Sequence, residues 1–217
     1  MLARQKRGSR LFGRDSRSQR QSGFSLIELL IVLAVMLIAS AFTIPLIMTS
    51  VSQYRLRTST VDLNGLLQRA RIRAVRDNRT YAVRTATFTQ GAFSYSQAYL
   101  DLNGNSILDA GEPMIQLQRG VSLNTNPGTA AISNATLGFA PQSATAQVNF
   151  NARGTPCVVV NTICSSWDSA AATPNQVGFV YYLRSTSGAN TSWAAVSISP
   201  SGRFRSWSNY NNSTWGY

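Results

Sequence analysis

The sequence predicts an α+β protein in which one long N-terminal helix packs on a single β-sheet-rich globular domain. Residues 24–48 form an almost uncharged apolar run, and residues 49–78 continue it with apolar side chains spaced as on one face of a helix. In residues 79–217, β-branched and aromatic segments alternate with stretches rich in Asn, Pro, Gly and Ser, as is typical of strands joined by loops. We therefore expect a transmembrane half of the helix, an amphipathic half, and a β-rich domain with a C-terminal tail. A basic leader in residues 1–23 precedes them.

The composition excludes several kinds of active site. The chain has 217 residues, with 20 Lys and Arg against 8 Asp and Glu, two cysteines and no histidine. Without histidine there is no Ser-His-Asp or Cys-His couple, and two cysteines with scattered acids match no usual zinc ligand set. The formal net charge of +12 is uneven, because residues 1–23 hold seven basic residues and one acid. We therefore expect neither an enzyme nor a bound cofactor.

The apolar run is long enough to cross a membrane. Leu29–Met48 holds 20 uncharged residues, about the ~20 that a helix needs to span a bilayer. The Arg-rich leader would stay in the cytoplasm, so the rest of the chain would lie on the outer side of the membrane. A secretory signal peptide is the alternative, since Ala39-Ser40-Ala41 fits a signal-peptidase site. Against it, the run continues past that site, and Glu28 places a carboxylate near its start, where burial without a partner is costly.

A short motif opens the apolar run. The segment Gly23-Phe24-Ser25-Leu26-Ile27-Glu28-Leu29 resembles the cleavage and methylation signature of type IV prepilins and type II secretion pseudopilins. The resemblance implies that a prepilin peptidase cleaves after Gly23 and that the new N-terminus at Phe24 is N-methylated. It also implies that Glu28 neutralises the N-terminal ammonium of a neighbouring subunit, which fits the preference of carboxylates for the first turn of a helix. Pro45 matches the family's helix-interrupting proline, and we expect a kink or a locally melted turn there.

The resemblance also implies partners and a location. The partners are other pilin or pseudopilin subunits, the prepilin peptidase and the bacterial inner membrane. The chain would cross that membrane once, with its C-terminal domain in the periplasm, before it enters a pilus or pseudopilus.

The amphipathic half carries two contrasting faces. Four apolar residues at i, i+4, i+7 and i+11 form a stripe that can pack on the domain. They are Leu63, Leu67, Ala70 and Ala74. Arg69, Arg73 and Arg76 share a second face, which is either a solvated basic surface or an anion-binding one. The run in residues 70–78 resembles the helix end of FimT-like minor pilins and H-type pseudopilins.

The remaining chain predicts a β-rich domain without an internal repeat. The expected strands are Tyr81–Phe88, a segment that contains Phe93, Tyr95 and Tyr99, Val158–Val160, Val177–Leu183 and Trp193–Ile198. Residues 122–147 and 165–176 are expected to be loops. Cys157 and Cys164 are the two cysteines, and in an oxidising periplasm they would form one disulfide.

Residues 101–112 admit two interpretations. Acid or amide side chains fall at positions one, three, five, nine and twelve of an EF-hand-type calcium loop. They are Asp101, Asn103, Asn105, Asp109 and Glu112. The sixth position, which should be glycine for the sharp turn, is Ser106, and the glycine comes two residues early at Gly104. Asn-Gly instead favours a hairpin loop with solvent-facing acids, and a similar stretch is typical of the FimT-like β domain. We expect the hairpin and keep calcium as the alternative.

The C-terminal segment carries a second arginine-rich pattern. Pro200-Ser201-Gly202 predicts a turn between two strands, after which Arg203, Arg205 and Trp207 would share one face. Two guanidinium groups and an aromatic ring on one surface can hold phosphates and stack a base. The run Gly202-Arg203-Phe204-Arg205 resembles the G-R-x-R motif of FimT-like pilins, which is associated with DNA binding in natural transformation. The alternative is that these arginines are merely solvated or pair with another subunit.

Taken together, the sequence predicts a minor pilin or pseudopilin that assembles into a filament through its N-terminal helix. DNA uptake is an added hypothesis, in which Arg203, Arg205 and Trp207, with Arg69, Arg73 and Arg76, bind double-stranded DNA without sequence preference. The alternatives are a type II secretion pseudopilin that binds no DNA and, more distantly, a secreted β protein with a signal peptide. Pili and secretion pseudopili share the same assembly helix, so the motif leaves both open.

Overall fold

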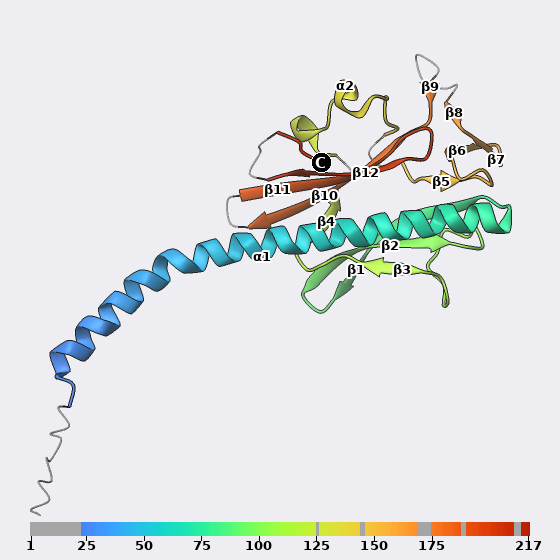
Figure 1. Ribbon diagram of the computed structural model, residues 1–217. Helices are drawn as coiled ribbons and strands as arrows, with labels where there is room; N and C mark the ends of the chain where they lie inside the picture. Colours follow the sequence, from blue (N-terminus) through green and yellow to red (C-terminus); the bar gives the residue numbers. More distant parts are fainter. Residues whose placement is uncertain (1–22, 125, 144–145, 169–174, 188–189, 211–213) are drawn as a thin grey trace, which may run out of the picture. The chain divides into compact units, whose positions relative to one another are not determined.

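The computed structural model describes residues 23–217 apart from 125, 144–145, 169–174, 188–189 and 211–213. The chain divides into two compact units, Met1–Thr43 and Ile44–Tyr217. Of the predicted leader, residues 1–22 lie outside the described residues. The helix α1, Leu26–Asp77, begins in the first unit and ends in the second (Figure 1). It continues through residue 45. The side chain of Pro45 lies outside the described residues, and the bend expected there stays a prediction.

The second part of α1 is the central element of the domain. Its predicted apolar stripe is confirmed, since Leu63, Leu67, Ala70 and Ala74 are all fully buried. The helix ends because Asn78 adopts a left-handed conformation with φ of 50°. The N–H of Arg79 donates to the carbonyl of Ala74 at 3.1 Å, and the N–H of Asn78 donates to that of Val75 at 3.4 Å, the two bonds of a Schellman C-cap.

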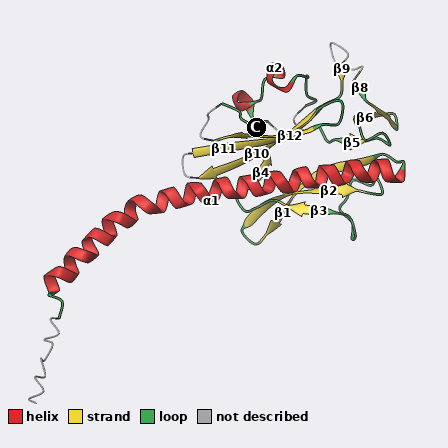
Figure 2. Cartoon of the chain, viewed as in Figure 1, coloured by secondary structure: helices red, strands yellow, loops and turns green. Residues whose placement is uncertain are grey.

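Two antiparallel sheets follow the helix (Figure 2). The first has the order β3-β2-β1-β5-β6-β7 and the second the order β12-β11-β10-β4, while β8 and β9 form a separate pair. The strands of the first sheet are β1 Tyr81–Gln90, β2 Phe93–Asp101, β3 Met114–Gln116, β5 Asn149–Phe150, β6 Pro156–Val160 and β7 Ile163–Ser165. Those of the second are β4 Val121–Asn124, β10 Phe179–Ser187, β11 Asn190–Ile198 and β12 Phe204–Asn209. The other elements are β8 Trp167–Asp168, β9 Asn175–Gln176, the 3-10 helix η1 Gly128–Ala130 and the short helix α2 Asn134–Leu137.

The main core lies between α1 and the two sheets. In Figure 1, the second part of α1 runs between β1, β2 and β3 on one side and β4, β10, β11 and β12 on the other. The buried cluster joins side chains of all these layers, such as Leu67 from α1, Val83 from β1 and Leu183 from β10. The apolar faces of the helix and of the two sheets are removed from water only when the three layers pack together. The helix is therefore an integral part of the domain core.

A second, smaller core covers the outer face of the sheet β12-β11-β10-β4. Along β10, Phe179, Tyr181 and Leu183 belong to the main core, whereas Val180 and Tyr182 belong to the smaller one. The segment around α2 supplies Ile132 and Leu137 to the smaller core, together with Trp193 and Trp207 from the sheet. Because both faces of β10 are buried over residues 179–183, these five residues are apolar or aromatic without alternation, whereas the rest of the strand is polar.

The predicted α+β class is confirmed, and so are the predicted strands, with shifted ends. The prediction of a loop over 122–147 is partly wrong, because β4 and α2 lie at or within that range. Val121 in β4 pairs with Ser185 in β10, and this contact joins residues far apart in the sequence. The prediction of a loop over 165–176 is partly wrong too, because its described residues include the short strands β8 and β9.

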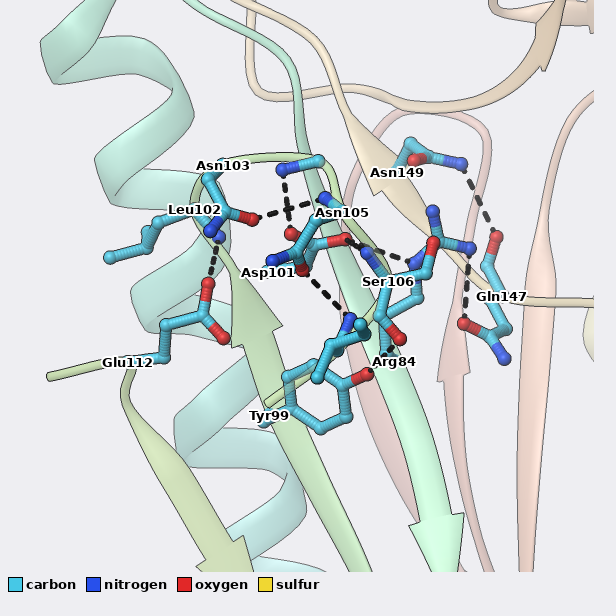
Figure 3. A network of polar contacts seen from close by, with 12 residues as sticks. Arg84, Tyr99, Asp101, Leu102, Asn103, Asn105, Ser106, Glu112, Gln147 and Asn149 are labelled. Carbon is cyan, nitrogen blue, oxygen red and sulfur yellow. Dashed lines mark hydrogen bonds and ion pairs between the residues drawn. The ribbon is translucent and has the colours of Figure 1, made fainter. Parts of the chain in front are cut away.

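The loop between β2 and β3 closes a hairpin, as expected (Figure 3). The expectation that its acids face solvent is wrong for Asp101, because this carboxylate is needed inside the loop as a hydrogen-bond acceptor. The carboxylate of Asp101 is almost fully buried and accepts the backbone N–H groups of Gly104 at 2.7 Å and Ser106 at 3.0 Å. Glu112 accepts the N–H of Leu102 at 2.7 Å and that of Asp109 at 3.1 Å. In the described part of the chain, no three Asp, Glu, Cys or His side chains gather to hold a metal ion. These carboxylates therefore close the loop, and the calcium alternative stays untested.

The two cysteines form a disulfide within the hairpin β6–β7. Cys157 and Cys164 are bonded, with their Cα atoms 5.5 Å apart. Asn161 and Thr162 both adopt positive φ, 47° and 68°, as the two-residue turn of this hairpin needs. The disulfide therefore fixes a hairpin whose outer residues Val160 and Ile163 are exposed.

Candidate functional site

The predicted processing site lies in exposed chain just before the helix. Phe24 is 83% exposed, and α1 begins only at Leu26. The first helical hydrogen bond runs from the N–H of Leu29 to the carbonyl of Ser25, at 3.1 Å. The peptide bond between Gly23 and Phe24 is therefore outside the helix, between two exposed residues. Glu28 is exposed in the first turn of α1.

The first part of α1 presents a mainly apolar surface, with Glu28 as its charged residue. Its large apolar side chains from Phe24 to Met48 are between 46% and 83% exposed. The helix is long and apolar enough to cross a membrane, and its most apolar stretch is not buried within the protein. A surface of this kind is stable in contact with lipid or with the helices of other subunits, not with water.

A second candidate surface forms where the end of α1 meets the turn before β12. The guanidinium of Arg71 donates from Nη1 to the carbonyl oxygen of Gly202, at 2.9 Å. The same side chain contacts Gly154, where an added Cβ would lie 3.1 Å from Nε of Arg71. Arg71 thus joins the helix, the loop before β6 and the turn before β12.

The turn that carries the arginine motif is tightly bonded. The N–H of Gly202 donates to the carbonyl of Ser199 at 2.8 Å, which confirms the predicted turn. The N–H of Ser199 donates to the carbonyl of Arg203 at 2.9 Å, and the N–H of Arg203 donates to Oγ of Ser199 at 3.0 Å. This geometry fixes the backbone from which Arg203 and Arg205 project.

The predicted arginines differ in their surroundings. Arg69, Arg203 and Arg205 are exposed, and within the described residues none of them forms an ion pair. Arg73 and Arg76 instead both form ion pairs with Asp77. Nε of Arg73 lies 3.4 Å from one carboxylate oxygen, and Nε of Arg76 lies 2.7 Å from the other. The hydrogen bond from Arg76, with further bonds from Tyr81 and Arg73, lowers the pKa of the Asp77 carboxyl to about 2. Asp77 therefore stays ionised and offsets part of the charge on that face of the helix.

The predicted role of Trp207 as a base-stacking residue is wrong. Its side chain is only 3% exposed and belongs to the smaller core. The indole N–H donates to Oγ of Ser197 at 2.8 Å, and the ring of Tyr217 packs edge-on against it at 5.4 Å. Trp207 does share the period-two face of Arg205, but this part of the face is covered by the C-terminal tail.

The helix end and the arginine motif border one groove of about 430 Å³, which we call the helix-end groove. It is lined by Gln68, Arg71, Ile72, Val75, Arg76 and Phe204. Of the arginines predicted to bind DNA, only Arg76 lines this groove, and Phe204, which lies between Arg203 and Arg205 in the sequence, lines it as well. Sequence reasoning missed the central role of Arg71, because its partner Gly202 is 131 residues away and no local pattern links them.

Comparisons with known proteins give two family matches. Residues 18–44 match the family described as the prokaryotic N-terminal methylation motif. Residues 59–202, more than half of the chain, match the family described as type II transport protein GspH. No curated protein and no solved structure matches the chain. The first match covers the exposed motif and the apolar helix, and the second covers most of the domain, so the chain belongs to the GspH family and is a pilin-like protein of the minor pilin or pseudopilin type.

Proposed function

We propose that this chain is cleaved between Gly23 and Phe24, is methylated at Phe24, and enters a pilus or pseudopilus through α1. The observation that carries the proposal is the exposed apolar surface of Phe24–Met48, which follows directly on the methylation motif. After cleavage, Phe24 would carry an ammonium group four residues before Glu28. In a filament, the carboxylate of one subunit and the ammonium of the next would neutralise each other, which offsets the cost of placing either charge among apolar helices.

The processing step is tested by the mass and N-terminus of the chain recovered from its own cells. We expect a chain that begins at methylated Phe24, and an uncut precursor when Gly23 is replaced by Val. Recovery of a chain cut after Ala41 would instead identify a signal peptide and overturn the proposal.

The assembly step is tested by two matched substitutions on α1, Glu28→Gln and Asp62→Asn. Each removes one carboxylate charge, and both residues are exposed. We expect the Glu28→Gln chain to be cleaved but absent from sheared filaments, while the Asp62→Asn chain is present as in the native case. Equal incorporation of the two variants would show that Glu28 has no part in assembly.

DNA binding is a second candidate function, favoured by the exposure of Arg69, Arg203 and Arg205 without an acidic partner among the described residues. Contacts of this number to phosphates give weak binding, with a Kd of ~10⁻⁴–10⁻⁶ M that rises steeply with salt. The family matches themselves carry no statement about DNA.

The test titrates the purified chain into a fluorescent duplex at low and physiological salt. Arg203→Ala/Arg205→Ala should abolish binding, whereas Arg57→Ala/Arg184→Ala removes the same charge from other exposed positions and should leave most of it. Equal loss in both double variants would indicate only a general attraction of a basic protein for DNA. No binding at low salt would leave the assembly role alone.

A further inference from the structure

A second groove lies at the start of the domain, where α1 leaves the apolar run. It has a volume of about 360 Å³ and is formed by α1, the turn before β4 and the end of β10. One part of the groove is lined by the apolar side chains of Ile47, Met48 and Val51. Another part is lined by the cationic side chains of Arg55 and Arg119. The backbone and hydroxyl groups of residues 185–187 complete the wall. We call this the Arg55 groove.

The walls of the Arg55 groove are held by contacts between elements. Oγ of Ser52 on α1 lies 2.8 Å from Oγ of Ser185 on β10, in a hydrogen bond that ties the helix to the strand. The N–H of Gln118 donates to Oγ of Ser59 at 3.0 Å, which fixes the turn that carries Arg119. The guanidinium of Arg119 also lies over the ring of Phe93, with Cζ 3.6 Å from the ring centre. Both cationic side chains therefore start from anchored positions.

The groove changes from apolar to cationic along the helix axis. Ile47 and Met48 are 56% and 62% exposed and end the run that is apolar enough for a bilayer. Arg55 follows Met48 by seven residues, or about 10 Å at ~1.5 Å per residue. The headgroup layer on each side of a bilayer is roughly 5–8 Å thick. With Met48 at the edge of the hydrocarbon, the Cα of Arg55 lies a few Å beyond this layer, and its long side chain can reach back to the lipid phosphates.

The two arginines of the groove have no acidic partner in the described part of the chain. Its three ion pairs involve Arg73, Arg76 and Arg84, so neither Arg55 nor Arg119 is among them. Guanidinium groups bind phosphate oxygens in a bidentate way. The groove thus offers two guanidinium groups without an acidic partner among the described residues, in the same groove as an apolar surface.

We propose that the Arg55 groove binds an anionic phospholipid of the membrane that α1 crosses, with its phosphate on Arg55 and Arg119 and an acyl chain along Ile47, Met48 and Val51. A free phosphate would bind the arginines but would leave the apolar part of the groove exposed to water. A neighbouring apolar helix would cover the apolar part but would leave the arginines without an anionic partner. The proposal rests on the membrane-anchored state in the proposed function. It gives the subunit a lipid contact that sets the height and rotation of the domain at the membrane surface before assembly.

The test uses the full chain in neutral detergent micelles with a short-chain fluorescent phosphatidylglycerol as the probe. Fluorescence anisotropy should show saturable binding that is at least several-fold tighter than for the matching phosphatidylcholine. Arg55→Gln/Arg119→Gln should weaken binding about tenfold or more, and Arg55→Lys/Arg119→Lys should retain part of it. Arg57→Gln/Arg184→Gln is the control with the same charge change: Arg57 lines a different groove, and Arg184 lies next to Ser185 in β10 and is exposed.

Three outcomes would overturn the proposal. Equal weakening in both Gln double variants would mean general electrostatic attraction, and displacement of the probe by inorganic phosphate alone would mean a free-phosphate site. Absence of saturable binding by the native chain, with its disulfide and thermal unfolding intact, would mean no lipid site. Because binding is measured without filaments, these results are independent of the Glu28→Gln assembly test, and either proposal can fail alone.

Discussion

At the scale of single residues, Arg71 and two glycines explain how the helix end is locked to the domain. Gly202 has φ of 79°, and a Cβ placed there would lie 2.7 Å from the carbonyl oxygen of Gly154. Gly154 has φ of 74° and would bring its own Cβ to 3.0 Å from the side chain of Val75. Both positions therefore need a residue without a side chain, and the resemblance based on G-R-x-R acquires a structural reason for its glycine.

Gly202→Ala should therefore destabilise the domain. A left-handed conformation costs an alanine of order 1–3 kcal/mol, and the clash with a backbone oxygen adds to it. Urea unfolding of the full chain in detergent, followed by tryptophan fluorescence, would measure the change. Gly65→Ala is the matched control: Gly65 lies inside α1 with open space around its missing Cβ, so alanine should stabilise by about 0.5–1 kcal/mol. An unchanged midpoint for Gly202→Ala would contradict the packing described above.

Asp77 gives a prediction about pH. Its pKa is lowered from 3.8 to about 2 in the folded chain, first by the hydrogen bond from Arg76. A lowered folded pKa means that the ionised carboxylate contributes stability above pH 3.8, and that this contribution disappears as the pH falls toward 2. Asp77→Asn should therefore lower the unfolding midpoint at pH 6 and have a much smaller effect near pH 2, where the carboxyl is half protonated. A difference that is the same at both pH values would contradict this role of the carboxylate.

At the scale of elements, Tyr181 connects the two sheets through one buried hydrogen bond. The N–H of Val148, which precedes β5, donates to the hydroxyl oxygen of Tyr181 on β10 at 2.8 Å. Both residues lie in the main core, and burial raises the pKa of the Tyr181 phenol far above its ordinary value. The hydroxyl is therefore neutral at physiological pH.

Tyr181→Phe should cost about 1–3 kcal/mol, because it leaves the buried N–H of Val148 without an acceptor. The change is measured as a difference in the free energy of unfolding. Tyr54→Phe removes the same hydroxyl from a side chain that is 71% exposed and should be neutral. Similar effects of the two substitutions would argue against the bond between the sheets.

The element scale also shows which features local patterns can predict. The stripe of Leu63, Leu67, Ala70 and Ala74 was predictable because the helical period alone selects the buried face. The β2–β3 hairpin was predictable because its turn chemistry is local. The short strand β4 was not, because its pairing with β10 supplies the reason for its extended conformation.

The candidate site likewise combines features that follow from local sequence with features that only the tertiary fold determines. The exposed motif at Gly23 and Phe24 is read from consecutive residues, and exposure of Arg203 and Arg205 follows from charge. Alternation correctly placed Trp207 on the face of Arg205, yet alternation cannot say that Tyr217 and the C-terminal tail cover that position. The Arg55 groove combines α1, the β4 turn and β10, so only the tertiary fold reveals it.

At the scale of the whole molecule, the helix α1 carries two kinds of apolar surface in succession. The apolar side chains from Phe24 to Met48 are exposed, whereas those of α1 that enter the domain core begin at Leu56. The first part of α1 is thus available for contact with lipid or other subunits, whereas the second part belongs to the domain core. The proposed transfer from the membrane to a filament would therefore require no change in the domain core.

This separation predicts where the chain can be shortened. A fragment of residues 52–217 keeps every buried residue of α1 and the bond between Ser52 and Ser185, so it should fold cooperatively without detergent. A fragment of residues 62–217 lacks Leu56, which is fully buried, and Ser59, which accepts the N–H of Gln118. Losing the buried leucine removes about 1.5–3 kcal/mol. The unpaired N–H adds about 1–3 kcal/mol, so the shorter fragment should melt much earlier or fail to fold.

Thermal unfolding of the two fragments by circular dichroism compares them directly. Leu56→Ala within the longer fragment isolates the packing contribution and should cost about 2–5 kcal/mol. If the shorter fragment were as stable as the longer one, the first turns of α1 in the domain would be dispensable. The helix would then be a membrane anchor attached to a self-sufficient β domain. If the fragment of residues 52–217 failed to fold, the exposed apolar part of α1 would have to contribute to the domain core, which its exposure argues against.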